Sequence, residues 1–170
     1  MIFYRGRRAI VVLIIGWGLL AGNGDRSSAE TPSEGQMVAV AVGAYEDKLY
    51  PVVESQILEF LKKFPESRHR LEMTYLLGRT YFRQNKFDKA RETFLGLIND
   101  DAVDTADQTN GLFWLAESCG QLNRWKEAKA YYLEFVGRTS DSPFLEKSFY
   151  ALGLISFQEK DLTQAETYFR

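Results

Sequence analysis

The sequence is poor in the residues from which many metal and catalytic sites are built. Its 170 residues include one cysteine and one histidine, which supply neither a disulfide within the chain nor a set of His and Cys zinc ligands. The motifs GxSxG, HExxH and CxxC and the phosphate-binding glycine loop are absent. Lysine and arginine (21) nearly balance aspartate and glutamate (23), and the net charge of −2 gives no reason to expect nucleic-acid binding. We therefore expect a protein without enzymatic activity, cofactor or metal site.

The first thirty residues have the pattern of an export signal. Three arginines among the first eight residues precede an uncharged, largely apolar stretch at 9–21, whose length falls within the roughly 7–15 residues of a secretory signal peptide. Small residues before Ala29 favour cleavage there, giving a signal peptide over 1–29, and Gly24 is a second candidate site. The alternative is an uncleaved signal anchor, which would tether the protein to a membrane. No cysteine follows the apolar stretch, so a lipoprotein signal is not expected.

The remainder of the chain is predicted to be helical and repetitive. Its four prolines are few, as helices require, and apolar residues recur at i, i+3, i+4 and i+7. A small or compact residue is followed twelve positions later by another, at 41 and 53, 78 and 90, 116 and 128, and 153 and 165. After a short tether at 30–33, this periodicity predicts an array of four antiparallel helix pairs at 34–66, 67–103, 104–141 and 142–170.

Each predicted helix pair has an expected packing logic. Gly78, Ala116 and Gly153 should let two helices approach closely, and Asn85 and Asn123 should make left-handed turns between them. Large side chains should fill the space between repeats: Phe87, Phe94, Trp125, Tyr132 and Phe169. We expect a capping box from Thr31 to Glu34 to start the first helix, and Ser142 to cap a helix that has Pro143 in its first turn.

The pattern Leu77-Gly78-x-x-Tyr81 followed by Ala90-x-x-x-Phe94, with its copies, resembles the tetratricopeptide repeat. The resemblance implies an all-α, right-handed α-solenoid of about four repeats, the last one incomplete. The repeats are 37 or 38 residues apart, and the segment from Phe60 to Ser67 is similar to long-spaced exported bacterial members of the family. These members include the outer-membrane assembly lipoprotein and the Tol-Pal coordinator protein. The resemblance implies a scaffold of the bacterial cell envelope, located in the periplasm or on its periplasmic face.

In this family the first helices of the repeats line a concave groove that binds a protein or peptide. The resemblance and helical spacing place aromatic and charged residues of the first helices in such a groove: Tyr45, Glu72, Tyr75, Arg79, Phe82, Arg83, Asn110, Phe113, Glu117, Tyr150 and Phe157. The alternative is that the aromatic members pack neighbouring first helices together. The sequence identifies no particular partner and no oligomeric state.

Other features support only secondary hypotheses. Four aspartates at 100, 101, 104 and 107 could hold calcium, but their spacing matches no calcium loop, and we expect a solvated connection. We expect His69 to be a solvated turn residue and Cys119 a buried apolar filler. The last copy stops within its second helix, which predicts a longer protein or an open end that pairs with another chain. The array could thus belong to a larger envelope enzyme or secretion component, or to a membrane-tethered assembly factor.

Overall fold

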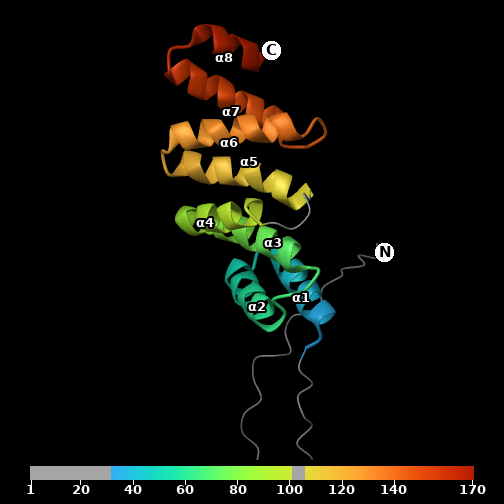
Figure 1. Cartoon of the computed structure of the whole chain (residues 1–170). Helices are drawn as coiled ribbons and strands as arrows, with labels where there is room; N and C mark the ends of the chain where they lie inside the picture. The colour runs from blue at the N-terminus through green and yellow to red at the C-terminus, as the bar shows by residue number, and fades with distance from the viewer. Residues whose placement is uncertain (1–31, 101–105) are drawn as a thin grey trace, which may run out of the picture. The chain divides into compact units, whose positions relative to one another are not determined.

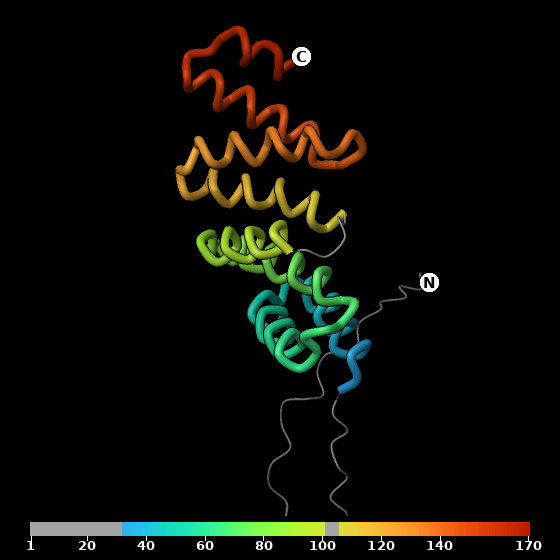
Figure 2. Tube along the Cα trace, viewed as in Figure 1, coloured from blue at the N-terminus to red at the C-terminus, as the bar shows by residue number. Residues whose placement is uncertain are grey.

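The computed structural model describes residues 32–100 and 106–170, so the predicted signal peptide and its cleavage sites lie outside the described residues. The described residues form eight α-helices and no strand. The helices alternate in direction and form four pairs in chain order (Figures 1 and 2). The bounds are α1 (Glu34–Glu46) with α2 (Tyr50–Lys63), α3 (Arg70–Arg83) with α4 (Phe87–Ile98), α5 (Ala106–Gln121) with α6 (Trp125–Arg138), and α7 (Leu145–Gln158) with α8 (Leu162–Phe169). The arrangement is an α-solenoid of about four repeats.

The turn within each pair uses the same backbone conformation. Asn85 and Asn123 have φ of 58° and 59°, as expected from their sequence positions. Lys48 and Lys160 occupy the equivalent turns with φ of 60° and 64°. A left-handed residue reverses the chain over a short distance, and asparagine adopts this conformation more readily than lysine. The shared geometry therefore extends to two turns whose residue type does not predict it.

Close packing within a pair depends on the small residues of the first helix. A Cβ atom built on Gly78 would lie 2.6–2.9 Å from three atoms of the Phe94 ring, which is fully buried. Gly153 faces Phe169 in the same way. Phe94 and Phe169 therefore each pack on the glycine of their own pair, a contact that the sequence analysis did not assign to them. Trp125 is 43% exposed and lines a hollow together with Ile155 and Gln158 of the next pair.

Two expected helix starts are corrected by the structure. Ser33, in extended conformation, caps α1: its Oγ accepts the Gln36 N–H at 3.4 Å, and the Gln36 Oε1 accepts the Ser33 N–H at 2.7 Å. The capping box thus begins at Ser33 and not at Thr31. Ser142 does not cap α7, because its hydroxyl accepts the Phe144 N–H in a preceding turn and donates to Asn110 Oδ1. Helix α7 begins only after this turn.

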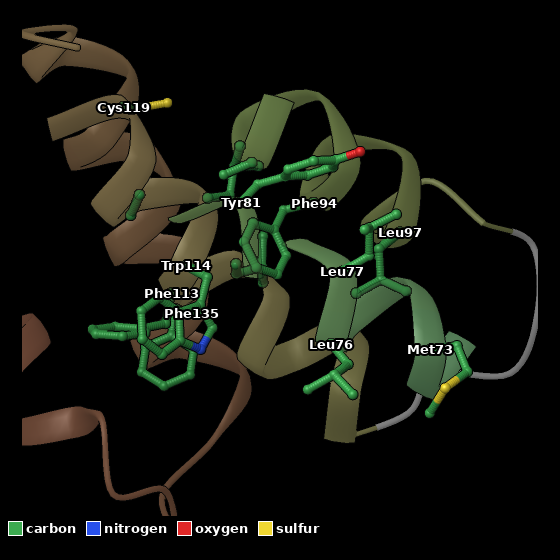
Figure 3. Close-up of a cluster of buried hydrophobic side chains, with 14 of the residues drawn as sticks. Met73, Leu76, Leu77, Tyr81, Phe94, Leu97, Phe113, Trp114, Cys119 and Phe135 are labelled. Atoms are coloured by element: carbon green, nitrogen blue, oxygen red, sulfur yellow. The ribbon is translucent and has the colours of Figure 1, made fainter. Parts of the chain in front are cut away.

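Neighbouring pairs share one continuous apolar core. Figure 3 shows Phe113, Trp114 and Phe135 gathered where α5 meets α6. Gly111 of α5 lies close to the preceding repeat, since a Cβ there would be 3.2 Å from Leu97. Cys119 is fully buried in this core, as expected, and burial raises the pKa of its thiol. The stack positions the side chains of α1, α3, α5 and α7 next to one another.

Candidate partner-binding surface

The predicted binding residues all lie on the first helices of the four pairs. We call the outward-facing residues of α1, α3, α5 and α7 the first-helix surface. Helix α1 carries Tyr45, and α3 carries five of the residues: Glu72, Tyr75, Arg79, Phe82 and Arg83. Helix α5 carries Asn110, Phe113 and Glu117, and α7 carries Tyr150 and Phe157. The structure brings some of these together, buries others and leaves a third group open to solvent.

Arg79 is the centre of an aromatic cluster that joins three repeats. Its guanidinium carbon lies 5.0 Å from the ring centroid of Tyr45, 5.6 Å from that of Tyr75 and 5.6 Å from that of Trp114. Trp114 Nε1 donates a hydrogen bond to the Tyr75 hydroxyl at 3.0 Å. Burial raises the pKa of Tyr75, although the nearby guanidinium opposes this change. We call Arg79 with these three rings the arginine cage.

Phe82 extends the cluster toward the turn of the second repeat. The centroid of its ring lies 5.2 Å from that of Trp114 and 5.3 Å from that of Phe87, and both contacts are edge-on. Trp114 was not among the predicted residues because Phe113, its neighbour, occupied the aligned position in the repeat pattern. Tyr75 and Phe82 are half-buried, so they take part in packing between first helices as well as facing solvent.

Two residues predicted for the surface are buried. Phe113 is 1% exposed and stacks on Phe144 with ring centroids 4.4 Å apart, so no partner can reach it. The Glu117 carboxylate accepts hydrogen bonds from the Tyr132 hydroxyl and, at 2.6 Å, from Lys147 Nζ. Burial raises the pKa of Tyr132, and the adjacent carboxylate adds to the effect. These residues join repeats three and four because α5 is covered by neighbours on both sides.

The remaining predicted residues are polar contacts or are exposed. Asn110 accepts the hydrogen bond from Ser142 and is partly buried. Glu72 is exposed and pairs with His69 Nδ1 at 2.9 Å, and Arg83 is exposed one helical turn beyond Arg79. Tyr150 and Phe157 are 58% and 60% exposed on α7. Between them lies Leu154, 42% exposed, which the sequence analysis did not select. A hollow lined by α7 and α8 adjoins Tyr150.

The described residues do not bring metal-ligating side chains together. Within 32–100 and 106–170, no group of three or more His, Cys, Asp or Glu side chains is arranged to hold a metal ion. Asp101 and Asp104 of the aspartate cluster lie outside the described residues, and Asp100 pairs with Arg70 at 2.6 Å. In the same two ranges, no helix is both long and apolar enough to cross a membrane.

The helix pairs, their glycine contacts and their shared core define a helical-repeat protein. Residues 75–143 match the family model described as "Tetratricopeptide repeat", and the described helices have the fold of an α-solenoid. A crystal structure of MamA has a TM-score of 0.69 and is 16% identical, covering 83% of this chain and 77% of that one. Pseudomonas aeruginosa PilF has a TM-score of 0.66 at 16% identity, with 83% and 60% covered. BtubC from P. vanneervenii has a TM-score of 0.63 at 22% identity, with 79% and 58% covered.

At these identities the similarity to solved structures shows the fold alone. No curated protein matches the sequence. Tetratricopeptide arrays generally serve as non-catalytic scaffolds that bind other proteins, which makes protein interaction the class of function suggested by the fold.

Proposed function

We propose that this protein is a non-catalytic scaffold of the bacterial cell envelope that binds a partner protein or peptide through its first-helix surface. The observation that carries the proposal is the stripe of Tyr150, Leu154 and Phe157 on α7, with exposures of 58%, 42% and 60%. These residues are spaced i, i+4 and i+7, so they share one helix face. Large apolar side chains gathered on an exposed helix face are characteristic of interaction sites.

Comparison with the second repeat supports the choice of this stripe. Tyr75, Arg79 and Phe82 occupy the same three positions on α3, where Trp114 of the next first helix covers them. In the described residues no corresponding ring covers the stripe on α7, although the Phe169 ring lies 5.8 Å from that of Tyr150. The stripe therefore presents to solvent the three positions that Trp114 contacts in the second repeat.

Substitution of the stripe tests the binding proposal. Immobilised protein carrying Tyr150→Ala and Phe157→Ala should lose a partner that the wild type captures from envelope extract. Leu133→Ala is the matched control, since Leu133 is 42% exposed on α6, a second helix, and should leave capture intact. Circular dichroism would verify that both variants are folded. Equal capture by all three proteins would contradict the proposal.

The location in the envelope is a separate part of the proposal. Its support is the sequence pattern at 1–29, in which basic residues precede an uncharged apolar stretch. Mass spectrometry of the mature N-terminus after cell fractionation tests it. A periplasmic protein beginning at residue 30 supports cleavage after Ala29, and a membrane-bound protein retaining 1–29 supports an anchored scaffold. A full-length protein in the cytoplasmic fraction would refute export.

A further inference from the structure

Trp125 begins the second helix of the third pair and, unlike its counterparts in the first two pairs, has no aromatic neighbour. Those counterparts, Tyr50 and Phe87, are half-buried. Each meets edge-on a ring near the end of the first helix of its own pair, with centroids 5.8 Å apart for Tyr45–Tyr50 and 5.3 Å apart for Phe82–Phe87. Trp125 is 43% exposed and contacts no other ring in the described part of the chain. The third pair therefore lacks a contact that the first two pairs share.

Gly120 accounts for the missing contact. It stands four positions after the small residue of its first helix, as Tyr45 and Phe82 do in theirs. A Cβ atom built on Gly120 would lie 3.6 Å from the Cζ3 atom of Trp125, which is ordinary van der Waals contact. Beyond the glycine's own helix and chain neighbours, no other described atom lies within 4 Å of that Cβ. We call the space beside Gly120 and the Trp125 ring the ring gap.

The ring gap lies next to the surface that carries the proposed binding. Trp125 adjoins a hollow of about 500 Å³, whose opposite wall is formed by Ile155, Gln158 and Glu159 at the end of α7. Ile155 and Gln158 directly follow two members of the α7 stripe, Leu154 and Phe157. The hollow is therefore continuous with the stripe, and a partner segment on the stripe comes within reach of Trp125.

The charges around the hollow favour an uncharged ring over a cation. Both carboxylates of its lining, those of Glu127 and Glu159, already pair with cations of the chain. Lys126 also lines the hollow and has no carboxylate partner among the described residues. Arg124 adds a second positive charge at the same wall. A cationic side chain over Trp125 would thus meet like charges, whereas a neutral aromatic ring needs no charged partner.

We propose that the ring gap receives an aromatic side chain of the bound partner, which meets Trp125 as the chain's own rings meet each other in the first two pairs. The inference rests on the proposed function and names the residue chemistry that its surface selects. The repeats share one fold, so the occupant of the equivalent place in the first two pairs indicates what fits the third. Aromatic pairs are stabilised beyond the area that they bury, and aromatic anchors in pockets carry much of the affinity of many interfaces.

Fluorine NMR of the full chain labelled with 5-fluorotryptophan tests the proposal at the site itself. The chain has three tryptophans, Trp17, Trp114 and Trp125, and the resonance lost in Trp125→Phe is that of Trp125. The probes are N-acetylphenylalanine amide, N-acetylleucine amide, N-acetyllysine amide and N-acetylglucosamine. The phenylalanine probe should shift the Trp125 resonance saturably, with an affinity roughly two- to tenfold above that of the leucine probe. The resonance of Trp114, which is 7% exposed, should not move.

Gly120→Phe assigns the response to the ring gap, because it supplies the missing ring from within the chain. This variant should remain folded and lose the response of Trp125 to the phenylalanine probe. Gly137→Phe is the matched control, since Gly137 is exposed on α6 and a Cβ there meets nothing within 4 Å, so the response should persist. Circular dichroism would verify that both variants are folded.

Several results would overturn the inference. These are the absence of a saturable Trp125 shift, an equal response to the phenylalanine and leucine probes, and a response that survives in folded Gly120→Phe. Tighter binding of the lysine probe or of N-acetylglucosamine would identify a cation or a sugar ring as the occupant and would also refute the proposal. The proposed function is judged by a separate readout, the capture of a partner by the stripe variants, so the two failures are distinguishable.

Discussion

Replacing Gly78 with alanine tests how closely the helices of a pair must approach. The added Cβ would lie 2.6–2.9 Å from the Cζ, Cε1 and Cε2 atoms of the Phe94 ring, well inside van der Waals contact. The ring is fully buried and cannot swing away into solvent. Overpacking of this kind costs about 1–3 kcal/mol, against a gain of roughly 0.5–1 kcal/mol when alanine replaces glycine within a helix. We expect the overpacking cost to dominate.

Gly96 provides the matched control on the partner helix α4. A Cβ atom there meets nothing within 4 Å, so Gly96→Ala should show only the gain in stability that alanine brings to a helix. In urea unfolding followed by circular dichroism, Gly78→Ala should be less stable than Gly96→Ala by about 1–3 kcal/mol. A stability for Gly78→Ala equal to or above that of Gly96→Ala would refute the reasoning.

A double-mutant cycle identifies the atoms responsible for the loss of stability in Gly78→Ala. Leucine lacks the three ring atoms that the new Cβ would meet, so Phe94→Leu should remove the clash while carrying a destabilising effect of its own. In the Phe94→Leu background, the added methyl group of Gly78→Ala should no longer be unfavourable. The cycle isolates the coupling between the two sites, because the separate effect of Phe94→Leu cancels. A coupling free energy of zero between the two substitutions would mean that a part of the structure other than the Phe94 ring accommodates the added methyl group.

Three further predictions concern a turn, a buried hydrogen bond and an ion pair. Lys48→Gly should stabilise the protein by about 1 kcal/mol in urea unfolding, because lysine is strained at φ of 60°; a loss of stability would contradict this. Tyr132→Phe should cost about 1–3 kcal/mol by depriving the buried Glu117 carboxylate of a donor, whereas Tyr131→Phe should be nearly neutral. The hydrogen bond from Lys86 lowers the pKa of Glu54 in the folded protein. The pair therefore stabilises the fold at pH values above the ordinary carboxyl pKa, and this stabilisation is lost as the pH falls through the lowered pKa. Glu54→Gln should therefore flatten the acid-side decline in stability, and an unchanged decline would count against the pair.

Repeat architecture was accessible from the sequence because it depends on local and periodic features. The pattern of small residues marked Gly78 and Gly153 as close contacts within their pairs, and asparagine in the turn predicted positive φ at positions 85 and 123. Cys119 was correctly expected to be buried, since an apolar helix face in a repeat array covers its neighbour. Periodicity alone could not separate contacts within a pair from contacts between pairs, so it did not predict that the Phe94 ring packs on Gly78 of its own pair.

The sequence by itself determined the class of fold, the register of the helix pairs and the helices that carry the candidate surface. Only the tertiary structure decided which of those residues a partner can reach. Phe113 and Tyr150 occupy the same position in their repeats, yet Phe113 is 1% exposed and Tyr150 is 58% exposed. Residue spacing defines a face of a helix, but the neighbouring helix determines whether that face is covered. The arginine cage has the same origin, because Tyr45, Tyr75 and Trp114 come from three repeats and meet around Arg79 only when the repeats stack.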